Sequence, residues 1–476
     1  MIVGRAKELE TLKECLAADR SRLIVVYGRR RVGKTFLVRE AFDYHFTFTH
    51  TGIEDGTLSE QLFGFWTSLR EQWDDGCCKP GTWMEAFELL KRAIRHSTDD
   101  RKTIFIDELP WMDTRNSGFV KAVEAFWNGW ASARKDVVMI VCGSAASWMV
   151  NKILQNRGGL FNRANRTIYL EPWTLHECEQ YLAEQNNPMD RKDIAAAYMI
   201  FGGAPYYWSL LDKRESLSQS VDRLFFAPKA ELGREFGRLY RSVFKEPETY
   251  VSVVTALATK RTGLTRDELV GLVPTLRNDG TLTHVLENLE TCAFVRRYAE
   301  TGKKKKGSVY QLVDNFTLFY FSFVKDYSGR DRQHWLHMVK DQKRIVWEAL
   351  AFELVCLLHS EQIKWKLGIS GVATEESSWR FVSDDPRVKG AQIDLVIRRG
   401  DHVTNLCEIK YSAGEYEIRD EEAARLREKV AAFIRETGTN DTCHLTFVTT
   451  YGLKRTRTSC VVQSEVTLDD LFNCDA

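Results

Sequence analysis

Residues 28–35 have the types and the spacing of a loop that binds phosphate groups. They read Gly28, Arg29, Arg30, Arg31, Val32, Gly33, Lys34 and Thr35. Glycines let backbone N–H groups wrap a phosphate, Lys34 can reach the β- and γ-phosphates, and the Thr35 hydroxyl can bind Mg²⁺. An apolar run at 23–27 precedes this P-loop, and a helical pattern at 35–42 follows it. That context favours a nucleoside triphosphate site over a chance glycine turn before a helix.

Three more polar residues follow apolar strands. The run at 102–106 leads into Asp107 and Glu108. At such a strand end we expect Asp107 to hold Mg²⁺ and Glu108 to polarise the attacking water as a general base. The run at 137–142 leads to Ser144, which would lie beside the γ-phosphate as a sensor. The alternatives are a solvated acidic turn for the two acids and an ordinary turn residue for the serine.

A second group of chemically active residues lies far along the chain. Asp394 falls on one expected strand, and Glu408 and Lys410 fall on the next. Because residues i and i+2 of a strand face the same side, Glu408 and Lys410 point together, and Asp394 can join them across the hairpin. Two carboxylates can bind Mg²⁺, and a lysine beside them can activate water and stabilise developing charge. These residues resemble the core of PD-(D/E)XK nucleases, and that resemblance implies a further metal-binding acid on the preceding helix, where Glu353 is preferred to Glu348.

Strands and helices alternate up to about residue 173, which predicts a parallel sheet with crossover helices. The expected strands are 23–27, 46–49, 102–107, 137–142 and 167–170. A helix is expected at 119–133, and residues 55–100 are expected to be largely helical. Residues 174–245 read as helices, broken by a turn at 201–205.

Residues 246–325 predict a winged helix-turn-helix. Helices at 250–259, 265–270 and 281–291 precede a hairpin, and the run Lys303–Lys306 stands at its tip. Four lysines on a wing could neutralise phosphates of a nucleic-acid backbone. A solvated hairpin and a protein–protein adaptor remain the alternatives.

Residues 330–476 predict a small α/β domain around the second group. A helix at 346–359 is followed by strands at 392–397 and 404–410, a helix near 423–426 and a strand at 445–448. The E-x-K pattern alone is weak, because alternating charges are common on edge strands. The spacing of Asp394 and Glu408 on two apolar strands strengthens it.

Length and composition indicate the number of domains and exclude several classes of protein. A length of 476 residues suggests about three domains. The net charge of +1 argues against a generally basic surface, so any contact with nucleic acid must be local. The 11 cysteines include no C-x-x-C pair, which indicates reduced thiols and neither a disulfide framework nor a zinc site. No signal pattern or long apolar run occurs, so we expect a cytoplasmic protein without a membrane partner.

The chain resembles archaeal and bacterial ATPases of the AAA+/STAND group that carry a C-terminal nuclease-like domain. The resemblance rests on Val3-Gly4-Arg5, the P-loop, Asp107-Glu108-Leu109-Pro110-Trp111, Gly143-Ser144, Leu160-Phe161-Asn162-Arg163 and Gly202-Gly203-Ala204-Pro205-Tyr206. It implies an ATPase core at 1–173, a helical lid at 174–245 and adenine as the base. It also implies that Arg163 senses the γ-phosphate charge, in cis or across a subunit boundary, with Arg157 and Arg166 as competitors.

The residues Asp394, Glu408 and Lys410 resemble the core of PD-(D/E)XK nucleases, although Gln392 stands where an acid is familiar. We therefore expect an ATP-binding and ATP-hydrolysing protein that gates a Mg²⁺-dependent nuclease-like domain acting on nucleic acid. One alternative is a signalling ATPase whose C-terminal domain binds DNA or a protein without cleavage. Another is an adaptor with slow or absent turnover, which the Asp107-Glu108 pair disfavours. An in-trans role for Arg163 would require an oligomer.

Overall fold

The chain forms two compact units. The computed structural model describes residues 2–73, 76–155, 160, 163–244, 246–298, 308–381 and 390–473. Lys303–Lys306, Arg157, Phe161 and Asn162 lie outside these residues. The first unit comprises Met1–Pro172, Ala204–Tyr206 and Gly237–Pro247, and the second comprises Trp173–Gly203, Tyr207–Phe236 and Glu248–Ala476. The finer division into four domains stays a prediction.

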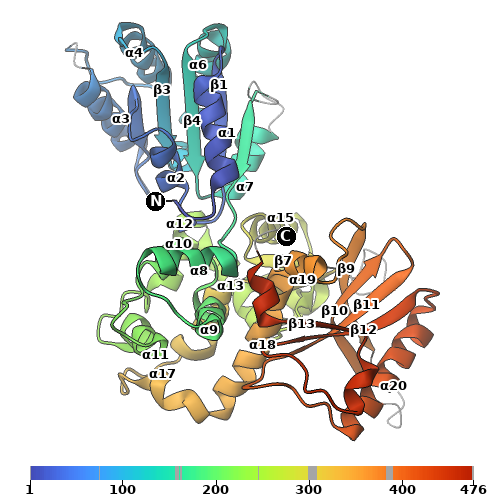
Figure 1. Ribbon diagram of the computed structural model, residues 1–476. Coiled ribbons are helices and arrows are strands. Elements are labelled where there is room, and N and C mark those ends of the chain that lie inside the picture. Colours follow the sequence, from blue (N-terminus) through green and yellow to red (C-terminus); the bar gives the residue numbers. More distant parts are fainter. Residues whose placement is uncertain are drawn as a thin grey trace. The chain divides into compact units, whose positions relative to one another are not determined.

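The first unit is built on a parallel five-stranded sheet in the order β2-β3-β4-β1-β5 (Figure 1). Its strands are β1 (Arg22–Tyr27), β2 (Phe48–Thr51), β3 (Lys102–Asp107), β4 (Val137–Gly143) and β5 (Arg166–Tyr169). β3 and β4 are buried along their whole length, as expected for central strands covered on both faces. With the P-loop directly after β1, this α/β arrangement is consistent with a P-loop NTPase fold.

Helices cover both faces of this sheet. The helices are α1 (Ala6–Ala17), α2 (Lys34–Ala41), α3 (Leu58–Gln72), α4 (Trp83–His96), α5 (Leu109–Met112), α6 (Phe119–Gly129) and α7 (Ala146–Trp148). One face packs on α1 and α2 through residues such as Leu12 and Leu37. The other packs on α3, α4 and α6 through large side chains such as Phe65, Trp83 and Phe126. This three-layer packing fixes the strand ends from which the polar residues project.

Two expected boundaries of the first unit are displaced. β2 begins at Phe48, two residues later than expected, because the ring of Phe46 packs on Phe105 and the strand pairing starts with Phe48 opposite Ile104. The helix expected at 119–133 ends at Gly129 and continues as a 3-10 turn.

The second unit begins with helices and a small antiparallel sheet in the order β6-β8-β7. The helices are α8 (Leu175–Glu184), α9 (Arg191–Phe201), α11 (Leu217–Val221), α13 (Pro247–Ala258), α14 (Arg266–Leu272), α15 (Gly280–Thr291), α16 (Asn315–Phe319) and α17 (His334–His337). The strands are β6 (Leu264–Thr265), β7 (Val295–Tyr298) and β8 (Val309–Leu312). Two further helices cross the unit boundary, α10 (Pro205–Trp208) and α12 (Glu235–Val243). No helix in the described ranges has the length and apolar character needed to cross a membrane.

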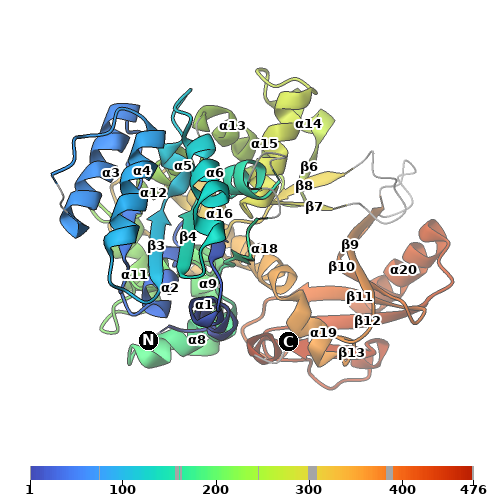
Figure 2. The same ribbon diagram turned by 90° about the horizontal axis from the view of Figure 1, so that it is seen from above.

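The same unit contains a mixed five-stranded sheet in the order β13-β12-β11-β10-β9 (Figure 2). Its strands are β9 (Thr374–Phe381), β10 (Ala391–Arg399), β11 (Val403–Lys410), β12 (Thr442–Thr449) and β13 (Ser464–Thr467). The accompanying helices are α18 (Gln342–Leu358), α19 (Ser360–Lys366) and α20 (Asp420–Thr437). α18 packs on β11, and α20 covers one face through Leu426 and Phe433. β10 and β11 form an antiparallel hairpin, which brings the expected acidic residues onto neighbouring strands.

His359 is a buried internal link of the second unit. Its Nε2 accepts a hydrogen bond from the Leu175 N–H (3.0 Å), and its Nδ1 lies 2.8 Å from the Val355 carbonyl oxygen. A carbonyl only accepts, so Nδ1 carries the proton and the ring is neutral. Burial lowers the pKa of His359 to about 4.

We expect this neutral histidine to make stability depend on pH. An unfolded His359 takes up a proton near pH 6.5 and the folded one only near pH 4, so its contribution is present above about 6.5 and is lost as the pH falls toward 4, by about 1.4 kcal/mol per pH unit. The urea midpoint at pH 7 and at pH 5 should differ less for His359→Gln than for wild type. His402→Gln, at a side chain that is 92% exposed, is the control. Equal pH sensitivity of the His359→Gln variant and wild type would contradict the assignment.

Candidate nucleotide and metal sites

The P-loop backbone has a shape that requires glycine at two positions. Gly28 has φ +147°, and a Cβ there would lie 2.4 Å from the Leu170 carbonyl oxygen. Gly33 has φ +89° and caps the N-terminus of α2. Side chains rarely adopt such angles, so the loop conformation depends on these glycines. The loop therefore presents its backbone at the start of a helix, where an anion is stabilised.

Lys34 lies at the centre of this loop. Its Nζ donates hydrogen bonds to the carbonyl oxygens of Gly28 (3.1 Å) and Arg29 (2.9 Å) and lies 3.4 Å from the Ser144 hydroxyl. The side chain is buried, so bulk water screens its charge only weakly. The structure thus brings the end of β4 to the P-loop lysine, and the sensor role expected for Ser144 stays a prediction.

The strand ends of β3 and β4 meet the start of α2. The Thr35 hydroxyl donates to Asp107 Oδ2 at 2.6 Å. The Glu108 carboxylate accepts hydrogen bonds from the Ser144 N–H (3.1 Å) and from the Ser144 hydroxyl. A hydroxyl and a carboxylate in contact are oxygen donors of the kind that Mg²⁺ prefers, so Thr35 and Asp107 fit the ion. Glu108 itself has φ +46°, a conformation that a non-glycine residue adopts only when its surroundings hold it.

The remaining P-loop residues have separate partners in the first unit. Arg29 and Val32 are buried, and Arg30 forms an ion pair with Glu54 at 3.6 Å. The Arg31 guanidinium lies 3.9 Å from the centre of the Tyr206 ring, whose residue also donates its N–H to the Arg31 carbonyl oxygen. This contact of Tyr206 with the loop was not anticipated.

Arg163 is joined to the P-loop by no hydrogen bond or ion pair among the described residues. It is exposed, and its side chain has no hydrogen bond or ion pair with any part of the chain that is described. Its competitor Arg166 begins β5 and is also exposed. The role expected for Arg163 stays a prediction.

The second candidate site centres on Glu408 of β11. Lys410 binds Glu408 Oε1 at 2.8 Å, so the two side chains do lie on one face of the strand. Lys429 of α20 binds the other oxygen at 2.6 Å. Burial raises the pKa of the Glu408 carboxyl, but the two lysines outweigh it and hold the pKa below the ordinary value. Sequence reasoning missed Lys429, because nothing in the local pattern of α20 relates it to β11.

Two more carboxyl groups face this cluster. Burial, followed by repulsion from Glu408, raises the pKa of Asp394; burial, followed by repulsion from Asp394, raises the pKa of Glu353. The other helical acid, Glu348, forms an ion pair with Arg344 at 2.8 Å. Of the two acids on α18, Glu353 is therefore the one whose charge is coupled to the strand carboxylates.

The cluster has donors suited to a divalent cation but is not assembled as a metal site. Acidic oxygens crowded in a buried place are a donor set for Mg²⁺, which would relieve their mutual repulsion. Within the described ranges, no group of three His, Cys, Asp or Glu residues is arranged to hold an ion. Lys410 and Lys429 instead neutralise Glu408. The carboxylates are chemically suited to Mg²⁺. Lys410 and Lys429 would have to release the Glu408 oxygens before those oxygens could bind the ion.

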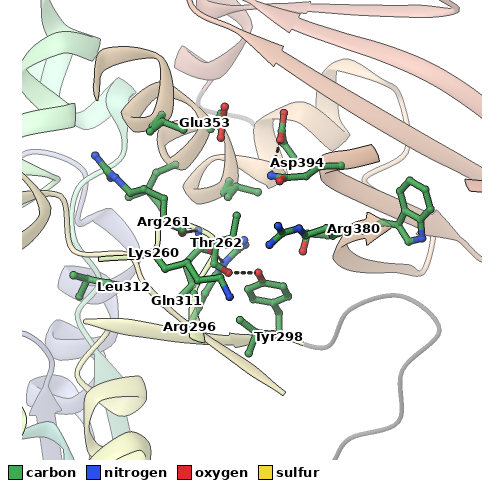
Figure 3. Close-up of a pocket in the computed structure, with 18 of the residues that line it drawn as sticks. Lys260, Arg261, Thr262, Arg296, Tyr298, Gln311, Leu312, Glu353, Arg380 and Asp394 are labelled. Carbon is green, nitrogen blue, oxygen red and sulfur yellow. Dashed lines mark hydrogen bonds between the residues drawn. The ribbon is translucent and has the colours of Figure 1, made fainter. Parts of the chain in front are cut away.

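A cavity of about 400 Å³ opens beside these acids (Figure 3). Glu353 and Asp394 line it from α18 and β10, and Gln392 lies within 3.4 Å of the Asp394 carboxylate. The basic residues Arg261, Arg296 and Arg380 also line it. The cavity lies wholly within the second unit.

Comparison with known proteins gives two relatives and a structural likeness. No protein-family model matches the chain. The uncharacterized protein MJECL04 of Methanocaldococcus jannaschii is 26% identical over 335 residues, 68% of this chain and 69% of its own. The uncharacterized ATP-binding protein MJ0423 of the same organism is 48% identical over 40 residues, 8% of this chain and 68% of its own. The Walker-type ATPase PABY2304 of Pyrococcus abyssi superposes with a TM-score of 0.47 at 16% identity, over 68% of this chain and 96% of its own.

Proposed function

Because the chain belongs to the same family as MJ0423, a short archaeal protein named for ATP binding, we propose that it binds ATP and hydrolyses it at the P-loop. The observation that carries the proposal is the convergence of Lys34, the Thr35–Asp107 pair and the Glu108–Ser144 pair around one loop. A cation, a pair of oxygen donors and a carboxylate at these places match the needs of phosphoryl transfer.

Each of these residues has a distinct task in the proposed reaction. Lys34 exchanges its contacts with loop carbonyls for the β- and γ-phosphate oxygens. Thr35 and Asp107 would hold Mg²⁺, which would supply positive charge against the negative charge developing on the phosphates. Glu108 accepts a proton from the attacking water, and Ser144 keeps the Glu108 carboxylate oriented. Arg163 is proposed to approach the γ-phosphate, in cis or from another subunit.

We further propose that ATP turnover gates a nuclease-like site in the second unit. Helices α13 to α15 with the β6-β8-β7 sheet would serve as a winged helix, and the β9–β13 sheet with α18 and α20 as a PD-(D/E)XK-like domain. Asp394, Glu408 and Glu353 would hold Mg²⁺ there, and the ion would supply Lewis acidity for water attack on a phosphodiester. Lys410 would orient that water or stabilise the charge that develops.

A binding switch without cleavage is the second candidate. It is favoured by the pairing of both Glu408 oxygens with lysines, which leaves the acid neutralised by the protein itself. In that case the second unit would bind nucleic acid or a protein partner through the same cavity. Cleavage assays separate the two candidates directly.

The test of the ATPase proposal is the substitution Glu108→Gln. The amide keeps the size of the side chain and can still contact Ser144, but it cannot accept a proton from water. We expect ATP binding, measured with a fluorescent analogue, to stay within about twofold of wild type, and phosphate release to fall by about 100-fold or more. Glu124→Gln on α6 is the matched control. Wild-type phosphate release by Glu108→Gln would remove Glu108 as the base.

A further inference from the structure

The cavity beside the carboxylates is lined by both acidic and basic groups. Glu353 and Asp394 supply carboxylates, Arg261 and Arg296 supply guanidinium groups, and Lys260 is paired with Glu268, which also lines the cavity. Figure 3 shows Arg261 on the side of Glu353, and Arg380 reaching from β9 toward the Arg261–Thr262 turn. A cavity that is lined by both carboxylates and guanidinium groups suits a ligand that combines a phosphate with a metal ion.

The turn that carries Arg261 is fixed by its own residues. The Gln311 amide donates to the Arg261 carbonyl oxygen at 2.7 Å, and the Tyr298 hydroxyl donates to the Thr262 carbonyl oxygen. Gly263 has φ +86°, and a Cβ there would lie 2.5 Å from the Tyr310 carbonyl oxygen. Only glycine allows this close approach to β8, so the turn holds one position.

The Arg261 side chain, in contrast, lacks a full set of partners. Its Nη2 is buried and has no hydrogen-bond partner among the residues that the structure describes. Burial lowers the pKa of Arg261 to about 10, so the group remains charged at neutral pH, and Glu353 is the acid that acts on it electrostatically. A buried donor without an acceptor is costly, whereas a phosphate can accept two parallel hydrogen bonds from a guanidinium.

We propose that this cavity binds a nucleotide unit of single-stranded nucleic acid, with its phosphate held by Arg261 next to Glu353 and Asp394. The proposal rests on the nuclease-like function proposed above and names the form of its substrate. A volume of about 400 Å³ suits one small ligand, not a duplex. Tyr298 also lines the cavity, with the Arg296 guanidinium 4.9 Å from the centre of its ring. Arg261 is thus a binding residue that the segment around β6 adds to the acids of the β10–β11 hairpin.

The test measures binding without cleavage. A fluorescein-labelled single strand of about 12 nucleotides and the corresponding blunt duplex are titrated with the full chain in EDTA, using fluorescence anisotropy. We expect the single strand to bind more tightly than the duplex, and Arg261→Gln to weaken single-strand binding by at least about tenfold. Arg261→Lys, which keeps the charge but loses the planar fork, should fall between the two. Arg435→Gln, at an exposed arginine of α20, should bind like wild type.

Two outcomes would overturn the inference: preference of the wild type for duplex, or unchanged single-strand binding by Arg261→Gln. Thermal unfolding and ATPase activity of each variant show that it has folded. The cleavage-deficient variant Asp394→Asn separates this inference from the proposed function, because it removes a negative charge facing the phosphate and should retain strand binding. Cleavage lost in Asp394→Asn with binding unchanged in Arg261→Gln would leave the nuclease proposal standing and remove this one. If single-strand binding depends on Arg261 but the wild type cleaves nothing, this inference stands and the nuclease proposal is removed.

Discussion

Lys34→Ala is expected to abolish ATP turnover. The substitution removes a buried cation that two loop carbonyls and the Ser144 hydroxyl surround, so the loop keeps its glycine-dependent shape but loses the charge that faces the phosphates. Removal of a single charge-stabilising donor from such a preorganised site lowers rates by on the order of 100-fold or more. Phosphate release measured with and without Mg²⁺ would show the loss.

The control for this prediction is Lys121→Ala, at an exposed lysine of α6. It removes the same charge from the same unit but far from the P-loop in sequence. Equilibrium binding of a fluorescent ATP analogue should be weakened by Lys34→Ala and unaffected by Lys121→Ala. Turnover at the wild-type rate in Lys34→Ala would remove the P-loop as the site of hydrolysis.

The strands that the sequence predicted are those with continuous apolar runs. β1, β3 and β4 are buried on both faces, so their central residues are apolar and the run is visible. The sequence did not predict β9 and β13, because they are the edge strands of the second-unit sheet. β9 buries little more than Trp379, and β13 little more than Val466. Edge strands can carry polar residues on both faces. The alternation of apolar and polar residues that indicates a strand is then absent from the sequence.

The candidate sites divide along the same lines. The P-loop is contiguous, and its glycines and lysine interact within a few residues of one another, so spacing alone indicates its chemistry. Tyr206, Lys429 and Arg261 reach their partners only through tertiary packing. For Lys429 and Arg261 the one available signal was that a buried acid needs a counter-charge, which does not say which cation supplies it. The preference for Glu353 over Glu348 as a metal ligand stays a prediction, although Glu353 lines the cavity with Asp394 and Glu348 is paired with Arg344.

Asp394→Asn is expected to eliminate Mg²⁺-dependent cleavage of nucleic acid while ATP hydrolysis continues. The amide is nearly the same size, so packing between β10 and β11 is kept, but a neutral oxygen is a poor ligand for a hard divalent cation. We expect cleavage to fall by at least about 100-fold, measured on labelled single strands and duplexes of DNA and RNA with and without ATP. Because burial and Glu408 already disfavour the charged form of Asp394, neutralising it should stabilise the fold slightly in the absence of metal.

Asp401→Asn gives the matched comparison, because Asp401 is an exposed acid at the β10–β11 turn whose partner is Arg399. It should cleave at the wild-type rate. Cleavage that survives in Asp394→Asn would place the metal site elsewhere or identify a contaminating nuclease. If wild type and both variants cleave nothing but hydrolyse ATP equally, the lysine-neutralised state of Glu408 is the working state of the protein, and the second unit acts as a nucleotide-controlled binding module.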